Sequence, residues 1–170
     1  SSSGWATGTI CQFSSTGYQV SIQQANTVQF CQNTGHMFGE VAYQVTMTIT
    51  QGDCGGLTFR YIDNNNLYFF EVCQNGQYDV GDYVNSNPNH IGLHTSSAIK
   101  QGLNQQNVIA VTVQGDTINM FVNGNTRIDF ATSAALTGST FSQGTIGLLA
   151  VDSGNPTSVT YTNALVWTAS

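Results

Sequence analysis

Apolar and polar residues alternate along much of the chain, most clearly in Val41–Gln51, where the odd-numbered positions 41–49 are apolar and the even-numbered ones are threonine, glutamine or alanine. This period of two, with many β-branched residues, predicts a strand with one buried face. Similar strands are predicted at residues 9–13, 17–22, 27–31, 55–62, 66–73, 76–84, 107–114, 117–122, 126–130, 144–151 and 158–168. Short turns rich in glycine, asparagine and serine separate them. We therefore predict an all-β jelly-roll sandwich of two antiparallel sheets, formed by residues 1–170 as one domain.

Residues 85–106 break this pattern. The segment is polar, contains Pro88, His90 and His94, and has no clean period. We expect a long surface loop with one helical turn near residues 96–100. Long loops in compact domains are often functional.

The hairpin around residues 63–64 predicts a register. Asparagine and aspartate accept the backbone angles of a two-residue turn, so Ile62 is expected to face Asn65. Cys54 then lies opposite Cys73, within disulfide distance. The register thus predicts a disulfide between these two cysteines.

The remaining cysteines, Cys11 and Cys31, pair by exclusion, and their disulfide is expected to close the N-terminal hairpin. None of the four cysteines belongs to a closely spaced pair of the kind that zinc sites use. Two disulfides imply an oxidising compartment, so we expect an extracellular protein, secreted or displayed on the cell surface. The chain begins with serine, from which removal of an upstream segment is expected.

A second two-residue turn is predicted at Asn75-Gly76. It places Tyr78 opposite Cys73 and Asp82 opposite Phe69, and a slip of one residue would reverse these faces. With this register, one open sheet face carries a cluster of aromatic and charged residues, namely Arg60, Phe69, Glu71, Tyr78 and Asp82.

The composition excludes several functions. Only 7% of residues are charged, against roughly a quarter in ordinary soluble domains. The net charge is −6, and Lys100, Arg60 and Arg127 are the only fixed cations. Nucleic-acid binding and attachment to anionic membranes both need more positive charge. No apolar run is long enough to span a bilayer, so membrane insertion is not expected.

Several segments are familiar in combination: GGLTFRYIDNNNLYFFEV at 55–72 with NGQY at 75–78, the VNG of 122–124, FSQGTIGLLA at 141–150, and VTYTNALVW at 159–167. Together they resemble the concanavalin A-like lectin/glucanase superfamily. Within it, they are similar to bacterial extracellular modules of the laminin-G-like, levanase fructan-binding and glucanase-like kinds. The paired cysteines at the start also resemble such modules.

This resemblance covers nearly the whole chain and implies a concanavalin A-like fold. It says less about activity, because the fold hosts lectins, hydrolases and adhesion modules. The chain departs from the glucanases in lacking their ExDxE strand, and from the usual FDN near the end, which reads Tyr161-Thr162-Asn163 here. The resemblance leaves room for a structural calcium ion whose ligands it does not locate; otherwise no cofactor and no metal site is expected.

The predicted face supports three interpretations. A structural network between Arg60 and the carboxylates explains it without a ligand. Sugar binding fits aromatic rings beside groups that pair with hydroxyls. A weak glycoside hydrolase would use Glu71 and Asp82, since hydrolysis needs two carboxyl groups about 5–10 Å apart.

Other candidate residues have simpler explanations. The histidines His36, His90 and His94 have no adjacent acidic ligand and are expected to be surface or loop residues. Asp63 and the three asparagines that follow it offer oxygen ligands of the kind calcium prefers, but their spacing fits a hairpin turn better.

We therefore expect a carbohydrate-binding or ligand-sensing module without catalytic activity, whose partner is a glycan or cell-surface polysaccharide. The alternatives are a self-associating subunit of an extracellular filament or adhesin, and the weak hydrolase.

Overall fold

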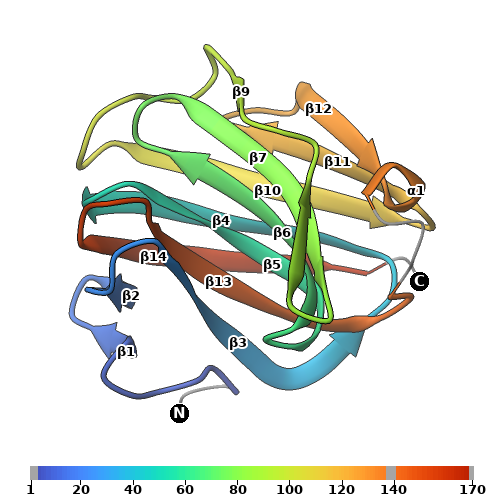
Figure 1. Ribbon diagram of the computed structural model, residues 1–170, viewed down its shortest axis with the longest axis horizontal. Coiled ribbons are helices and arrows are strands. Elements are labelled where there is room, and N and C mark those ends of the chain that lie inside the picture. Colours follow the sequence, from blue (N-terminus) through green and yellow to red (C-terminus); the bar gives the residue numbers. More distant parts are fainter. Residues whose placement is uncertain (1–3, 137–140, 169–170) are drawn as a thin grey trace.

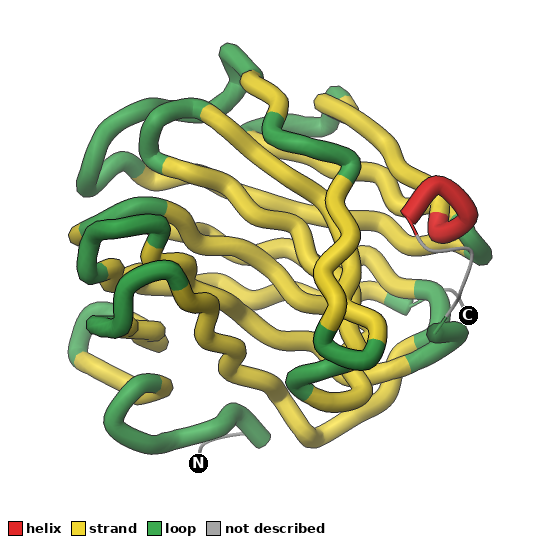
Figure 2. Tube along the Cα trace, in the orientation of Figure 1, coloured by secondary structure: helices red, strands yellow, loops and turns green. Residues whose placement is uncertain are grey.

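The computed structural model describes residues 4–136 and 141–168, and strands make up most of them (Figure 2). Two antiparallel sheets lie one over the other (Figure 1). The first sheet has the order β1 (Cys11–Ser14), β2 (Gly17–Ile22), β14 (Thr157–Trp167), β4 (Val41–Gln51), β10 (Gln106–Gln114), β11 (Thr117–Val122) and β12 (Arg127–Thr132). The second sheet has the order β3 (Thr27–Phe38), β13 (Gly144–Asp152), β5 (Cys54–Asp63), β6 (Asn66–Cys73), β7 (Gln77–Val84) and β8 (Asn87–His90), with β9 (His94–Thr95) also paired to β7.

The predicted strands are all present, and Val41–Gln51 has the predicted bounds. Segment 85–106 differs in part, because β8 and β9 add two short strands beside β7. The expected helical turn is a single turn in which Ile99 N donates to Ser96 O at 3.3 Å. The one helix among the described residues is α1 (Ser133–Leu136).

The inner faces of the two sheets bury one large apolar core, because alternate residues of each strand point between the sheets. Tyr161 shows how polar groups are satisfied there: its hydroxyl accepts from Gly56 N at 2.7 Å and donates to Leu149 O at 2.6 Å. Because Tyr161 belongs to the first sheet and its partners to the second, these hydrogen bonds help to set the distance between the sheets, in addition to the apolar packing.

Both predicted disulfides are confirmed. Cys54 and Cys73 face each other on β5 and β6, as the register predicted. Cys11 and Cys31 lie on β1 and β3, which belong to different sheets. This second disulfide therefore joins the two sheets at the N-terminal end instead of closing a local hairpin.

The predicted register between β6 and β7 is wrong by one residue. Val72 pairs with Tyr78 and Glu71 with Asp79, so the loop has three residues, 74–76, where two were predicted. Gly76 ends it with a φ of 88°, the left-handed residue that a three-residue hairpin loop requires. The slip moves every β7 side chain to the opposite face from the predicted one.

An irregularity in β5 displaces Arg60. The pairing changes between Phe59 and Asp63, where β5 has two more residues than β6, and Arg60 has a φ of 44°. Because of this bulge, Tyr61 lies on the outer face instead of Arg60.

The second sheet curls toward its outer face. Phe30 on β3 and Tyr83 on β7 are separated by three other strands, yet their ring centroids lie 5.6 Å apart. Neighbouring strands of a flat sheet lie about 4.8 Å apart, so residues four strand spacings apart would be about 19 Å from each other. Only strong curvature of the sheet brings their side chains into contact. The outer face is therefore concave.

Candidate functional site

The five residues of the predicted face do not lie together. Phe69 and Glu71 are on the concave outer face of the second sheet, as predicted. Tyr78 and Asp82 are on its inner face, because of the register slip in β7. Arg60 is at the β5 bulge, 5% exposed, and its Nε donates to Gly39 O at 3.2 Å.

The three displaced residues have structural contacts. The Tyr78 hydroxyl donates to Asp129 Oδ2 at 2.9 Å, and burial with this contact raises the pKa of Tyr78 to about 12. Asp82 is fully buried and accepts from Asn89 Nδ2 at 2.9 Å. Burial lowers the pKa of Arg60, which the nearby Tyr68 partly offsets. The predicted hydrolytic pair of Glu71 and Asp82 is therefore also wrong, because the two side chains lie on opposite faces of one sheet.

A groove follows the concave face, and we call it the second-sheet groove. Its central cavity has a volume of about 230 Å³. The lining residues are Val28, Phe30, Phe69, Glu71, Asp79, Tyr83, His90, Leu93, Leu149, Val151 and Ser153. They come from β3, β13, β6, β7 and β8 and from the loops after β8 and β13, so the curl of the sheet assembles the groove from distant parts of the chain.

Two carboxyl groups and an imidazole lie together in this groove. Glu71 and Asp79 face each other on β6 and β7. His90 Nδ1 lies 2.7 Å from Asp79 Oδ2, while Asp79 Oδ1 is buried without a hydrogen-bond partner. Burial, with a contribution from Asp79, raises the pKa of Glu71 from 4.5 to about 7. Near neutral pH, Glu71 can therefore both donate and accept hydrogen bonds.

Aromatic rings form the wall beside these polar groups. Phe69 lies edge-on to His90, with ring centroids 5.4 Å apart, and also contacts Tyr83 at 5.8 Å. Phe30, on the edge strand β3, lies edge-on to Tyr83. Aromatic surface beside a few convergent polar groups is the usual composition of a small-ligand site.

Sequence reasoning missed Asp79, Tyr83 and His90. The two-residue loop predicted before β7 places Asp79 and Tyr83 on the core face, whereas the observed three-residue loop places them on the concave face. The available signal was Gln74-Asn75-Gly76, a three-residue loop with glycine at its last position. His90 falls in the predicted loop, whereas in the structure it lies on β8 and pairs with Gly81 of β7.

Metal binding has little support in the groove. Cys54 and Cys73 cluster with Glu71 at one end of the groove, in an adjoining cavity, but both sulfurs belong to a disulfide and are not free to act as thiolate ligands. At the β5–β6 turn, Asp63 Oδ1 accepts from Asn65 N at 2.8 Å and from Asn66 Nδ2 at 3.0 Å, which is the turn chemistry predicted for this segment.

Two antiparallel seven-stranded sheets, the second one curled, define a class: the chain has the concanavalin A-like jelly-roll fold. The carbohydrate binding module CBM66 from Bacillus subtilis is similar in structure, with a TM-score of 0.78 and 19% identity over 96% of this chain and 95% of that one. A Bacillus licheniformis β-glucanase has a TM-score of 0.60 and 14% identity over 100% and 94%. Sheep galectin-11, in complex with glycerol, has a TM-score of 0.56 and 10% identity over 86% and 100%.

These similarities establish the fold, which binding modules, galectin-like proteins and glycoside hydrolases share. No protein-family model matches the chain, and no curated protein matches it in sequence. Among the described residues, no helix has the length and apolar character needed to cross a membrane.

Proposed function

We propose that this chain is an extracellular carbohydrate-binding module and that its glycan lies in the second-sheet groove. The observation that carries the proposal is the meeting of Glu71, Asp79 and His90 with the rings of Phe69 and Tyr83 in one cavity. The rings offer apolar surface to the C–H faces of a sugar, while the carboxyl and imidazole groups bind its hydroxyls in pairs. The two disulfides fit an oxidising extracellular setting.

The test is isothermal calorimetry of the whole chain against fructans, β-glucans and soluble cell-wall oligosaccharides. Tyr83→Ala and His90→Ala should each weaken binding by about tenfold, since removing a central contact of a site typically costs more than 1 kcal/mol. His36→Ala is the matched control, because His36 is exposed on β3 outside the groove. Full affinity in both groove variants would refute this location.

A second candidate function is glycoside hydrolysis, favoured by the raised pKa of Glu71 beside Asp79. A carboxyl group that keeps its proton near pH 7 can act as a general acid, and a neighbouring carboxylate can serve as nucleophile or base. Reducing-sugar release from the glycans that bind would reveal this activity, and Glu71→Gln should abolish it. Binding without any sugar release would leave the groove as a binding site alone.

A further inference from the structure

The outer face of the first sheet carries a second organised set of side chains. The strand registers align one residue from each of five neighbouring strands: Trp167 pairs with Ala42, Ala42 with Thr112, Thr112 with Asn119, and Asn119 with Phe130. We call this set the Trp167–Phe130 row. It crosses β14, β4, β10, β11 and β12, and four strand spacings give it a length of about 19 Å.

The two ends of the row are exposed aromatic rings. Trp167 and Phe130 are each 52% exposed, so each presents apolar aromatic surface to solvent. The residues between them are small or hydrogen-bonding. This arrangement differs from the contiguous apolar centre that a subunit interface normally has, so it favours a ligand with alternating apolar and hydroxyl surfaces over a second protein.

Hydrogen bonds hold the middle and far end of the row in place. Asn119 Nδ2 donates to Thr112 Oγ1 at 3.2 Å, and Arg127 Nη1 donates to Asn119 Oδ1 at 2.8 Å. The Arg127 guanidinium also lies over the Phe130 ring, 4.8 Å from its centroid. Preorganised side chains lose little conformational freedom when a ligand binds.

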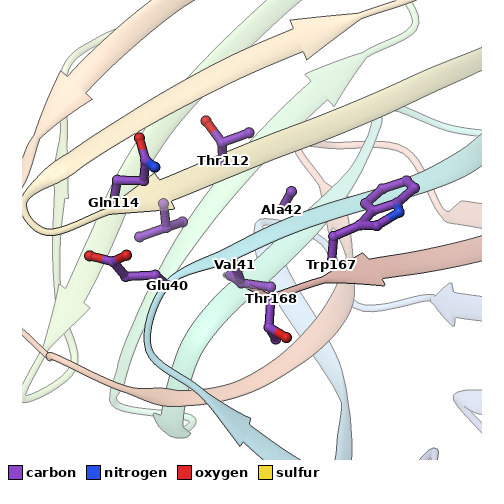
Figure 3. Close-up of a pocket in the computed structure, with 8 residues that line it drawn as sticks. Glu40, Val41, Ala42, Thr112, Gln114, Trp167 and Thr168 are labelled. Carbon is purple, nitrogen blue, oxygen red and sulfur yellow. The ribbon is translucent and has the colours of Figure 1, made fainter. Parts of the chain in front are cut away.

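A cavity of about 250 Å³ opens beside the near end of the row. Figure 3 shows the Trp167 indole on one side of Ala42 and Thr112 on the other. Because alanine is small, it leaves a depression between the ring and its polar neighbours. Glu40 and Gln114 line the same cavity and supply hydrogen-bonding groups.

We propose that the Trp167–Phe130 row is a second glycan-binding surface, which takes an uncharged linear polysaccharide lying across the strands. Its length accommodates several consecutive sugar rings, with one stacked on each terminal aromatic side chain. A neutral ligand fits because Glu40 is the only charged residue within the row and its adjoining cavity. Arg127, which lies beside the far end of the row, already contacts Asn119 and Phe130. The row and the second-sheet groove lie on opposite outer faces of the sandwich, so the two sites are independent.

The experiment measures binding of the whole chain to insoluble cellulose, chitin and β-1,3-glucan by depletion from solution. Trp167→Ala and Phe130→Ala should each weaken binding to the retained polysaccharide by about tenfold or more. Trp167→Phe should keep most of the affinity. Phe13→Ala is the matched control, since Phe13 is 51% exposed on β1, away from the row.

A spectroscopic readout reports on the same residue directly. The chain has two tryptophans, Trp5 and Trp167, so Trp5→Phe leaves Trp167 as the sole indole. Soluble oligosaccharides of the retained polysaccharide should shift its fluorescence to shorter wavelength, as water leaves the ring. Tyr83→Ala tests the groove separately and should leave this shift unchanged.

Two results would overturn the proposal: no retention on any of the three polysaccharides, or full retention by Trp167→Ala. If full retention comes with a changed sedimentation coefficient of the free variant, the row is a contact between copies of this chain. Failure of the groove proposal appears instead in calorimetry of Tyr83→Ala and His90→Ala, so the two proposals fail separately.

Discussion

The buried carboxyl group of Glu71 is expected to make the free energy of unfolding depend on pH. In the folded chain its pKa is about 7, against an ordinary value of 4.5. Below pH 4.5, both the folded and the unfolded chain keep this proton. Between pH 4.5 and 7 the unfolded chain loses it while the folded chain retains it, so the free energy of unfolding falls as pH rises through this window.

The magnitude follows from the difference in pKa. A difference of about 2.5 corresponds to about 3 kcal/mol of destabilisation once pH exceeds 7. Glu71→Gln replaces the carboxyl group by a neutral group of the same shape. We therefore expect the variant to gain about 3 kcal/mol over the wild type at pH 8, and to differ little from it at pH 4.5.

Urea unfolding at pH 4.5 and pH 8, followed by circular dichroism at low salt, measures this difference. Glu40→Gln is the control, because Glu40 is the other glutamate of the chain and is exposed. Ionisable groups away from Glu71 contribute about equally to wild type and variant, so they cancel in the comparison. Equal losses of stability in Glu71→Gln and in the wild type between the two pH values would contradict this prediction.

Three further variants and one control test the sandwich itself by urea unfolding. Tyr161→Phe removes a hydroxyl that accepts from Gly56 N and should cost about 1–3 kcal/mol, because that buried N–H loses its partner. Gly56→Ala should cost about 2 kcal/mol or more, since its Cβ would lie 2.1 Å from a carbonyl oxygen of the neighbouring strand; Gly124→Ala, with open space around it, should be nearly neutral. Replacing Cys54 and Cys73 together by serine should lower the free energy of unfolding by about 3 kcal/mol, because the unfolded chain regains the entropy of a loop closed over a 19-residue separation. Unchanged stability would show that the unfolded chain is already constrained there.

The sequence alone determined where the strands lie, because alternation of apolar and polar residues is a local property of a strand with one buried face. Val41–Gln51 has the predicted bounds for this reason. It also determined the Cys54–Cys73 pair. That success was partly fortuitous: the turn pairs Asp63 with Asn66, and the bulge in β5 restores the predicted register at the cysteines.

The site depended on features that are not local. One extra loop residue before β7 exchanged Tyr78 and Asp82 for Asp79 and Tyr83 on the concave face, because side chains alternate with a period of two. The curl of the second sheet then brought Phe30 against Tyr83 across three strands.

The Trp167–Phe130 row also depends on features that are not local in the sequence. Its residues are scattered between positions 42 and 167, and only the order and register of five strands align them. Sequence therefore determined which residues form strands, and the tertiary structure decided which side chains meet. The physical reason is that a strand's alternation is set by its own residues, whereas its face and its neighbours are set by loop length, bulges and sheet curvature.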